Sequence, residues 1–111
     1  MAHRSFTLTL PGTPAWSNLY TLMLAVPGAV PVDGILPKLV SELEIQADKG
    51  NASKTVTLGD GNNANTSGRV LQASDIESRG KSGGMNRIHL PDYWIKGSTG
   101  SEVIEVDIDF R

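Results

Sequence analysis

The stretch Glu102-Val-Ile-Glu-Val-Asp-Ile-Asp-Phe110 decides the fold. From Ile104 onward apolar and acidic side chains alternate strictly, which is the pattern of an extended strand with one buried face and one polar face. The apolar face consists of Ile104, Val106, Ile108 and Phe110. The polar face consists of Glu105, Asp107 and Asp109. We therefore predict a strand over Glu102–Phe110 whose apolar side faces a core.

A second strand of the same kind is predicted over residues 39–47. Its apolar positions are Leu39, Leu43, Ile45 and Ala47. The intervening Glu42, Glu44 and Gln46 point to the opposite face of an extended chain. This is the clearest strand pattern in the first half of the sequence.

Shorter β patterns fill most of the remaining chain and are separated by turns rich in Gly, Asn and Ser. They cover residues 6–10, 54–58, 70–73, 86–90 and 92–96. Residues 59–68 are predicted to form a long loop, and Arg79–Gly84 a flexible basic turn. About seven short strands with such turns predict a mainly β, antiparallel fold, either a β-sandwich or a jelly-roll-like barrel.

The segment before Leu39 has a more mixed character. Its first strand is predicted to end at Pro11-Gly12, and Ser17 is a candidate cap for a short helix. Helical spacing is shared by Leu19, Leu22, Met23 and Val26, although a buried strand is the alternative over the same residues. Pro27–Pro37 contains three prolines and two glycines and is predicted to be an irregular arm. We expect one domain, in which residues 1–38 pack on a β-sandwich core formed by residues 39–111.

Composition narrows the classes of function. The 111 residues fit one domain, and ten basic against twelve acidic residues give a net charge of −2, which disfavours a dedicated nucleic-acid or polybasic membrane binder. Because the chain contains no cysteine, disulfides, thiolate zinc sites and cysteine nucleophiles are excluded. The apolar stretch Leu19–Val26 is too short to span a bilayer and is not placed like a secretory signal. We expect a soluble protein made in the cytoplasm.

Each candidate chemical motif lacks a required residue. Gly80-Lys81-Ser82 resembles the end of a phosphate-binding loop, but Asp75 stands where that loop needs a glycine. The segment from Asp60 to Ala64 imitates the start of a calcium loop, but Ala64 cannot ligate and Leu71 stands in place of the bidentate glutamate.

Other residues also fall short of a chemical site. His3 and His89 are too far apart in sequence to form a recognisable zinc motif. No base accompanies any serine in a known nucleophile pattern. We therefore predict no catalytic residues, metal or cofactor, and a protein that is not an enzyme.

The acidic residues of the last strand form the strongest candidate surface. Carboxylates at alternate positions of a strand lie roughly 7 Å apart and together attract a basic neighbour or a cation; calcium is the cation that oxygen ligands suit. A basic stretch contains Arg79, Lys81 and Arg87. We predict that it meets the acidic ladder on an adjacent strand or on a neighbouring subunit. Trp94 and Tyr93 alternate on a predicted strand, so that one enters the core and Trp94 is a candidate contact residue.

Three stretches resemble small β-rich accessory structural proteins of tailed bacteriophage virions. They are Leu43-Glu-Ile-Gln-Ala-Asp48 with Gly50-Asn51, Val56-Thr-Leu-Gly-Asp60 with Asn62, and Gly68 with Leu71. A late strand resembling Ile88–Gly97 then precedes the C-terminal strand. The resemblance covers roughly residues 39–110 and carries over no catalytic residue.

The resemblance implies a non-enzymatic virion protein, most simply a capsid decoration or cement protein, or a neck or tail component. Its partners would be the major capsid protein or other virion proteins, together with further copies of itself, such as a trimer. The alternative is a carbohydrate-binding β module that uses Trp94 or Tyr93 and the loop from Asp60 to Asn65.

Overall fold

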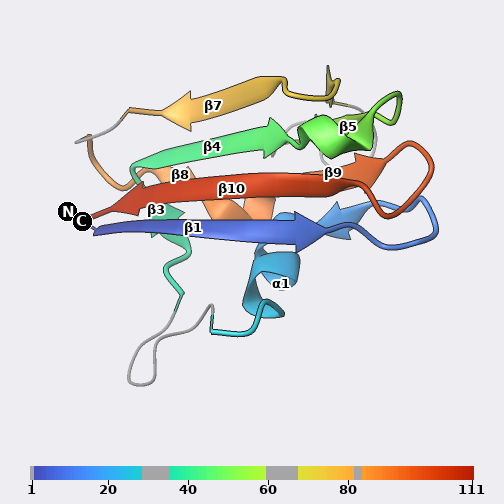
Figure 1. Ribbon diagram of the computed structural model, residues 1–111. Helices are drawn as coiled ribbons and strands as arrows, with labels where there is room; N and C mark the ends of the chain where they lie inside the picture. Colours follow the sequence, from blue (N-terminus) through green and yellow to red (C-terminus); the bar gives the residue numbers. More distant parts are fainter. Residues whose placement is uncertain (1, 29–35, 60–67, 82–83) are drawn as a thin grey trace.

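The computed structural model describes residues 2–28, 36–59, 68–81 and 84–111. It is mainly β with one short helix, as predicted, and every strand pairing is antiparallel (Figure 1). Sheet A contains, in spatial order, β1 (Ala2–Thr9), β10 (Val103–Phe110), β4 (Glu42–Ala47) and β7 (Ile76–Gly80). Sheet B contains β2 (Ser17–Asn18), β9 (Trp94–Gly97), β5 (Val56–Gly59) and β6 (Arg69–Leu71). Sheet C pairs β3 (Leu39–Val40) with β8 (Ile88–His89).

The last strand lies in the interior of sheet A, with one face buried as its alternation predicted. Its inner residues Ile104, Val106 and Ile108 are completely buried, and Phe110 packs against the edge of the core. β10 pairs with β1 on one side and with β4 on the other. One continuous core therefore collects apolar side chains from both large sheets and from the helix.

The helix α1 (Leu19–Leu24) confirms the helical alternative for this segment. Its cap is Asn18, one residue after the predicted Ser17; the Asn18 side chain accepts a hydrogen bond from the Thr21 N–H at 3.2 Å. Leu19, Tyr20 and Met23 are buried, so the apolar stripe faces the core. Among the described residues, no helix has the length and apolar character needed to cross a bilayer.

The arm that follows α1 lies partly outside the described residues, which omit 29–35. Its last part is held to the helix, because the buried Tyr20 hydroxyl donates to the carbonyl of Leu36, which is itself fully buried. The predicted loop over 59–68 lies outside the described residues at 60–67.

Two strand predictions differ from the structure. The predicted strand over 39–47 is interrupted at Ser41, whose N–H and hydroxyl both donate to the Asp109 carbonyl, at 2.8 and 3.0 Å. β7 was not predicted, because Ile76 is the only apolar residue in Ile76–Gly80 and an edge strand can lack a hydrophobic pattern. The predicted basic turn therefore begins inside a strand.

Two 3₁₀ turns complete the described elements: η1 (Lys49–Asn51) and η2 (Leu90–Asp92). η1 forms part of the connection between β4 and β5, and η2 shortens a predicted strand. η2 occupies the end of the predicted strand 86–90, where Pro91 cannot donate to a ladder, and β9 accordingly starts later, at Trp94.

The turn between β9 and β10 is organised by a buried carboxylate. Glu102 was predicted to begin the last strand, but its fully buried side chain instead accepts hydrogen bonds from the N–H groups of Thr99, at 2.8 Å, and Gly100, at 3.0 Å. Burial by itself would raise the pKa of Glu102, but these backbone donors outweigh it and hold the pKa below its ordinary value. Gly97 is required beside it, since a Cβ there would lie 1.9 Å from Glu102 Oε1.

We predict that Glu102→Gln destabilises the protein by about 1.5–3 kcal/mol at pH 7, because charge-assisted hydrogen bonds to buried donors are lost. A lowered folded pKa means that the stabilisation is present above the ordinary value of 4.5 and is lost as the pH falls through the folded pKa. The difference between variant and wild type should therefore shrink below about pH 4. Urea unfolding followed by tryptophan fluorescence measures it, with Glu44→Gln as the surface control; equal midpoints for both variants would contradict the role of Glu102.

Candidate functional site

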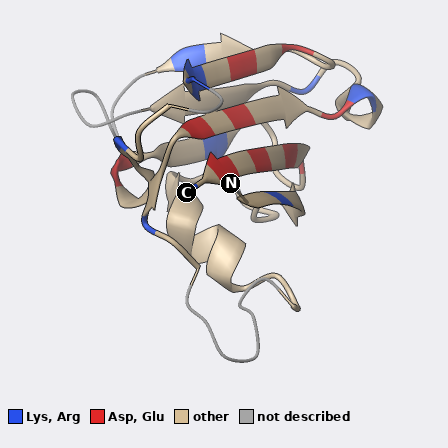
Figure 2. Ribbon diagram, turned by 90° about the vertical axis from the view of Figure 1, so that its left-hand side faces the viewer, with Lys and Arg blue, Asp and Glu red and all other residues tan. Residues whose placement is uncertain are grey.

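The outer surface of sheet A carries an acidic face, which we define as Glu42 and Glu44 of β4 and Glu105, Asp107 and Asp109 of β10. The register places these carboxylates side by side, because Asp109 pairs with Glu42 and Asp107 with Glu44. Figure 2 shows the acidic residues on neighbouring strands, in contrast to the uncharged α1. Like charges directly opposite one another repel, so this face is electrostatically destabilising unless a cationic group approaches it.

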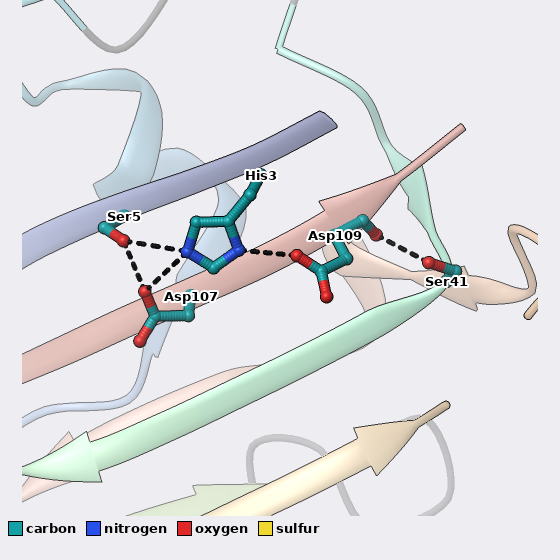
Figure 3. A network of polar contacts seen from close by, with 5 residues as sticks. All are labelled: His3, Ser5, Ser41, Asp107 and Asp109. Atoms are coloured by element: carbon teal, nitrogen blue, oxygen red, sulfur yellow. Dashed lines mark hydrogen bonds and ion pairs between the residues drawn. The ribbon is translucent and has the colours of Figure 1, made fainter. Parts of the chain in front are cut away.

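One cationic group of the same chain does approach it, from β1. His3 lies opposite Asp109 and Ser5 opposite Asp107 in the β1–β10 register. His3 Nδ1 is 2.5 Å from Asp109 Oδ1, and His3 Nε2 is 3.3 Å from Asp107 Oδ1 (Figure 3). The Ser5 hydroxyl donates to Asp107 Oδ1, and it also lies 3.2 Å from His3 Nε2. The imidazole thus bridges two carboxylates at one end of the acidic face.

The two aspartates favour the protonated imidazole. The hydrogen bond to Asp109 is the main cause that raises the pKa of His3 above 6.5, and the negative charges of Asp109 and Asp107 add to it. Desolvation lowers the pKa and is the second-largest influence on it, but the hydrogen bonds and charges of the two aspartates together outweigh it. At any given pH His3 therefore carries more positive charge against the acidic face than an isolated imidazole would.

The order of contacts Ser5, His3, Asp109 matches the order in a serine hydrolase, but the protons are placed differently. The Ser5 hydroxyl proton points to Asp107 and not to His3, and both nitrogens of the His3 ring contact aspartate oxygens. A hydrolase also needs preorganised donors for an oxyanion, whereas this network lies on the exposed face of a sheet. The network is best explained as a set of side-chain contacts that stabilise the pairing of β1 with β10.

At the other end of the acidic face, Glu105 lies beside Asp48. Burial raises the pKa of Glu105, and a hydrogen bond and the negative charge of Asp48 raise it further. The two carboxyl groups, with Gln46 and Lys49, line a shallow hollow. Within the described part of the chain, no group of three or more His, Asp or Glu residues has an arrangement that would hold a metal ion.

The strand order separates Arg79 of β7 from the ladder on β10, which the basic stretch was predicted to meet. β4 lies between β7 and β10, so the adjacent-strand form of that prediction is wrong. Arg79 lies on the inner side of β7, where it pairs with Leu43 in register and its Nη1 is 3.3 Å from Glu77 Oε1. Glu77 also contacts Arg69 of β6 at 2.7 Å and thereby links sheet A to sheet B. Contact with a neighbouring subunit stays a prediction.

Lys81 and Arg87 lie beyond the end of β7 and line a separate hollow of about 330 Å³. The other residues lining it are Ser41, Gly80, Gly84, Met85 and Ile88. Gly80 is needed there, because it has a φ of +81° and a Cβ would lie 2.2 Å from the Ser41 carbonyl oxygen. In the part of the chain that the structure describes, no carboxylate forms an ion pair with Lys81 or Arg87.

Of the neighbouring aromatics Tyr93 and Trp94, one was predicted to enter the core, and Tyr93, directly before β9, does so. Tyr93 is 7% exposed and belongs to the core, whereas Trp94 is half-buried on the opposite side of the strand. Trp94 pairs in register with Asn18 and Gly59 on sheet B, which is remote from the acidic face in the strand order. The predicted contact residues therefore fall into three separate places: the acidic face, the end of β7 and sheet B.

Sequence reasoning did not identify His3 and Ser5 as part of the candidate site. The period of alternation at Phe6–Leu10 extends back through Ser5 and His3, and this would have placed both on the polar side of a longer strand. Their partners lie more than 100 residues away, so the contact itself becomes visible only in the pairing of β1 with β10.

The chain matches no family model, no curated protein and no solved structure.

We predict that His3 titrates with a pKa above 6.5 and that Asp109→Asn lowers it, because the principal hydrogen bond then loses its charged acceptor. A raised folded pKa stabilises the protein fully below 6.5, and this contribution is lost as the pH rises through the folded pKa. NMR titration of the imidazole protons gives the pKa directly. Glu44→Gln removes a charge from the same face without touching His3 and is the matched control; a His3 pKa at or below 6.5 in the wild type would show that the bridge does not form.

Proposed function

We propose that this protein is a non-enzymatic structural protein of a tailed-phage virion, most simply a β-sandwich that decorates the capsid. The observation that carries the proposal is the acidic face: an array of carboxylates on two neighbouring strands, with His3 at one end as a counter-charge. Such a surface suits docking onto a basic protein surface, where complementary charge sets orientation and speeds association. The resemblance of the sequence to virion accessory proteins is the reason for proposing that the basic partner belongs to a virion.

A symmetric shell makes weak contacts of this kind effective. Each copy needs only a modest interface with the major capsid protein, because the same contact recurs at every equivalent position of the lattice. A neck or tail component is the alternative location, and it would use the same face against a different basic partner.

The test is co-sedimentation of the purified protein with capsids of the phage that encodes it. We expect binding that weakens with salt, and we expect Asp107→Lys to reduce apparent affinity by about tenfold or more, because a charge at the centre of the face is reversed. Asp92→Lys is the matched control, since it makes the same charge change on η2, at a side chain that is 56% exposed.

The possible outcomes separate the alternatives. Protein that stays unbound with capsids but sediments with purified tails would move the assignment to the tail. Protein that binds neither particle, or binds equally as Asp107→Lys, would contradict the proposal. A fluorescence change of Trp94 on titration with glycans would instead support the carbohydrate-binding alternative, for which Tyr93 is too deeply buried.

A further inference from the structure

The edge strand β7 is complementary in charge to itself. The sequence Asp75-Ile-Glu-Ser-Arg-Gly-Lys81 carries acids at positions 75 and 77 and bases at positions 79 and 81, arranged symmetrically about Ser78. If two copies of this strand lie antiparallel with Ser78 opposite Ser78, Glu77 of each faces Arg79 of the other, and Asp75 faces Lys81. Opposite charges directly across two strands stabilise the pair, and like charges destabilise it.

The backbone of β7 has hydrogen-bonding groups available for such pairing. Lys81 N–H donates to the Ser41 carbonyl and Ala47 N–H donates to the Asp75 carbonyl, so the odd-numbered residues of β7 form the hydrogen bonds with β4. The even-numbered Ile76, Ser78 and Gly80 therefore direct their N–H and C=O groups away from β4. β7 is the last strand in the order of sheet A, and those groups lie along its outer edge, where the Ser78 carbonyl accepts from Arg79 Nη1 at 3.1 Å and keeps a second lone pair for a further donor.

The same register brings the charged side chains close together. With Ser78 opposite Ser78 as a hydrogen-bonded pair, Glu77 and Arg79 occupy the non-hydrogen-bonded position, where Cα atoms are only about 4.5 Å apart. Glu77 already accepts from Arg69 and Arg79 of its own chain, and a carboxylate has acceptor positions for a further guanidinium. Moving the centre of symmetry to residue 77 or 79 places two acids or two bases face to face, so one register is selected.

Exposed apolar surface lies where this pairing would cover it. Ile76 is 51% exposed and would face Gly80 of the second copy, which has no side chain to obstruct it. Gly80 borders the hollow of about 330 Å³, whose lining includes Ile88 and the 66% exposed Met85. The Ile76 side chain of each copy can therefore pack toward the hollow of the other.

We propose that two copies of this chain associate through their β7 edges about a two-fold axis at Ser78, and so join their A sheets into one continuous sheet with four strands from each copy. The occupant of this edge is a second copy because the match is between β7 and itself. The proposal differs from the trimer expected by resemblance to virion proteins. It does not depend on the virion role, because it concerns association of the purified chain alone.

Charged residues on an edge strand often have the opposite purpose, which is to prevent pairing. Charge reversal distinguishes an edge that pairs with its own copy from an edge that prevents pairing. Sedimentation velocity of the full chain at low salt should show a dimer for the wild type. Glu77→Arg and Arg79→Glu should each raise the dimer dissociation constant by about tenfold or more, since both symmetry-related pairs become repulsive. An equimolar mixture of the two variants should dimerise again, because every cross-strand pair between them is of opposite charge.

A backbone variant tests the edge without changing charge. Ser78→Pro removes an N–H that points away from β4, so the monomer should fold while the dimer is lost. Thr7→Pro is the matched control. The Leu10 N–H donates to the Glu102 carbonyl, so the even-numbered residues of β1 bond to β10 and the Thr7 N–H faces the opposite open edge. Circular dichroism of each monomer verifies folding.

Hydrogen exchange of the wild type keeps the test decisive if a variant fails to fold. The amides of Ile76 and Ser78 should be protected at high protein concentration and exposed on dilution. A wild type that is monomeric at several hundred micromolar, a dimer that survives Ser78→Pro, or a mixture of charge variants that stays monomeric would each overturn the proposal. None of these results bears on capsid binding, which is measured separately.

Discussion

The pairing of β10 with a strand on each side is the constraint on which the structure depends. β1 comes from the beginning of the chain and β4 from its middle, and both are fixed in register by the alternation of the last strand. A shift of one residue would turn Ile104, Val106 and Ile108 outward and bury the acids, which would remove the apolar core and desolvate unpaired charges. The hydrophobic face therefore determines the position of every other strand in sheet A.

The acidic face follows from that choice of register. Burial of one side of β4 and β10 forces their carboxylates onto a common surface, where their mutual repulsion is tolerated because the apolar side supplies the stability. His3 reduces this repulsion at one end, and at the other end burial and the charge of Asp48 raise the pKa of Glu105. A surface that opposes folding in this way is one that a protein partner can stabilise.

The acidic face and the β7 edge differ in physical character. The acidic face presents side-chain charge and suits a basic partner of a different sequence. The β7 edge presents backbone groups that do not bond to β4, together with two acids followed by two bases, and it therefore suits its own copy. Both belong to sheet A, yet one is a face and the other an edge, so a capsid contact and a self-contact can form at the same time.

The periodicity of the sequence by itself determined the β class and the buried side of β10, because alternation is local and does not depend on partners. It left both a helix and a buried strand open for the segment that forms α1, and the structure decided for the helix. The periodicity also placed Glu105, Asp107 and Asp109 on one face. Only the tertiary structure decided which strands are neighbours: it put β4 between the acidic ladder and Arg79, brought His3 against Asp107 and Asp109, and made a strand of Ile76–Gly80. Glu102, which was predicted to begin the last strand, lies at the centre of the turn before it for the same reason. Partners distant in the sequence are selected by burial and backbone hydrogen bonding across the whole core, and no local pattern encodes that selection.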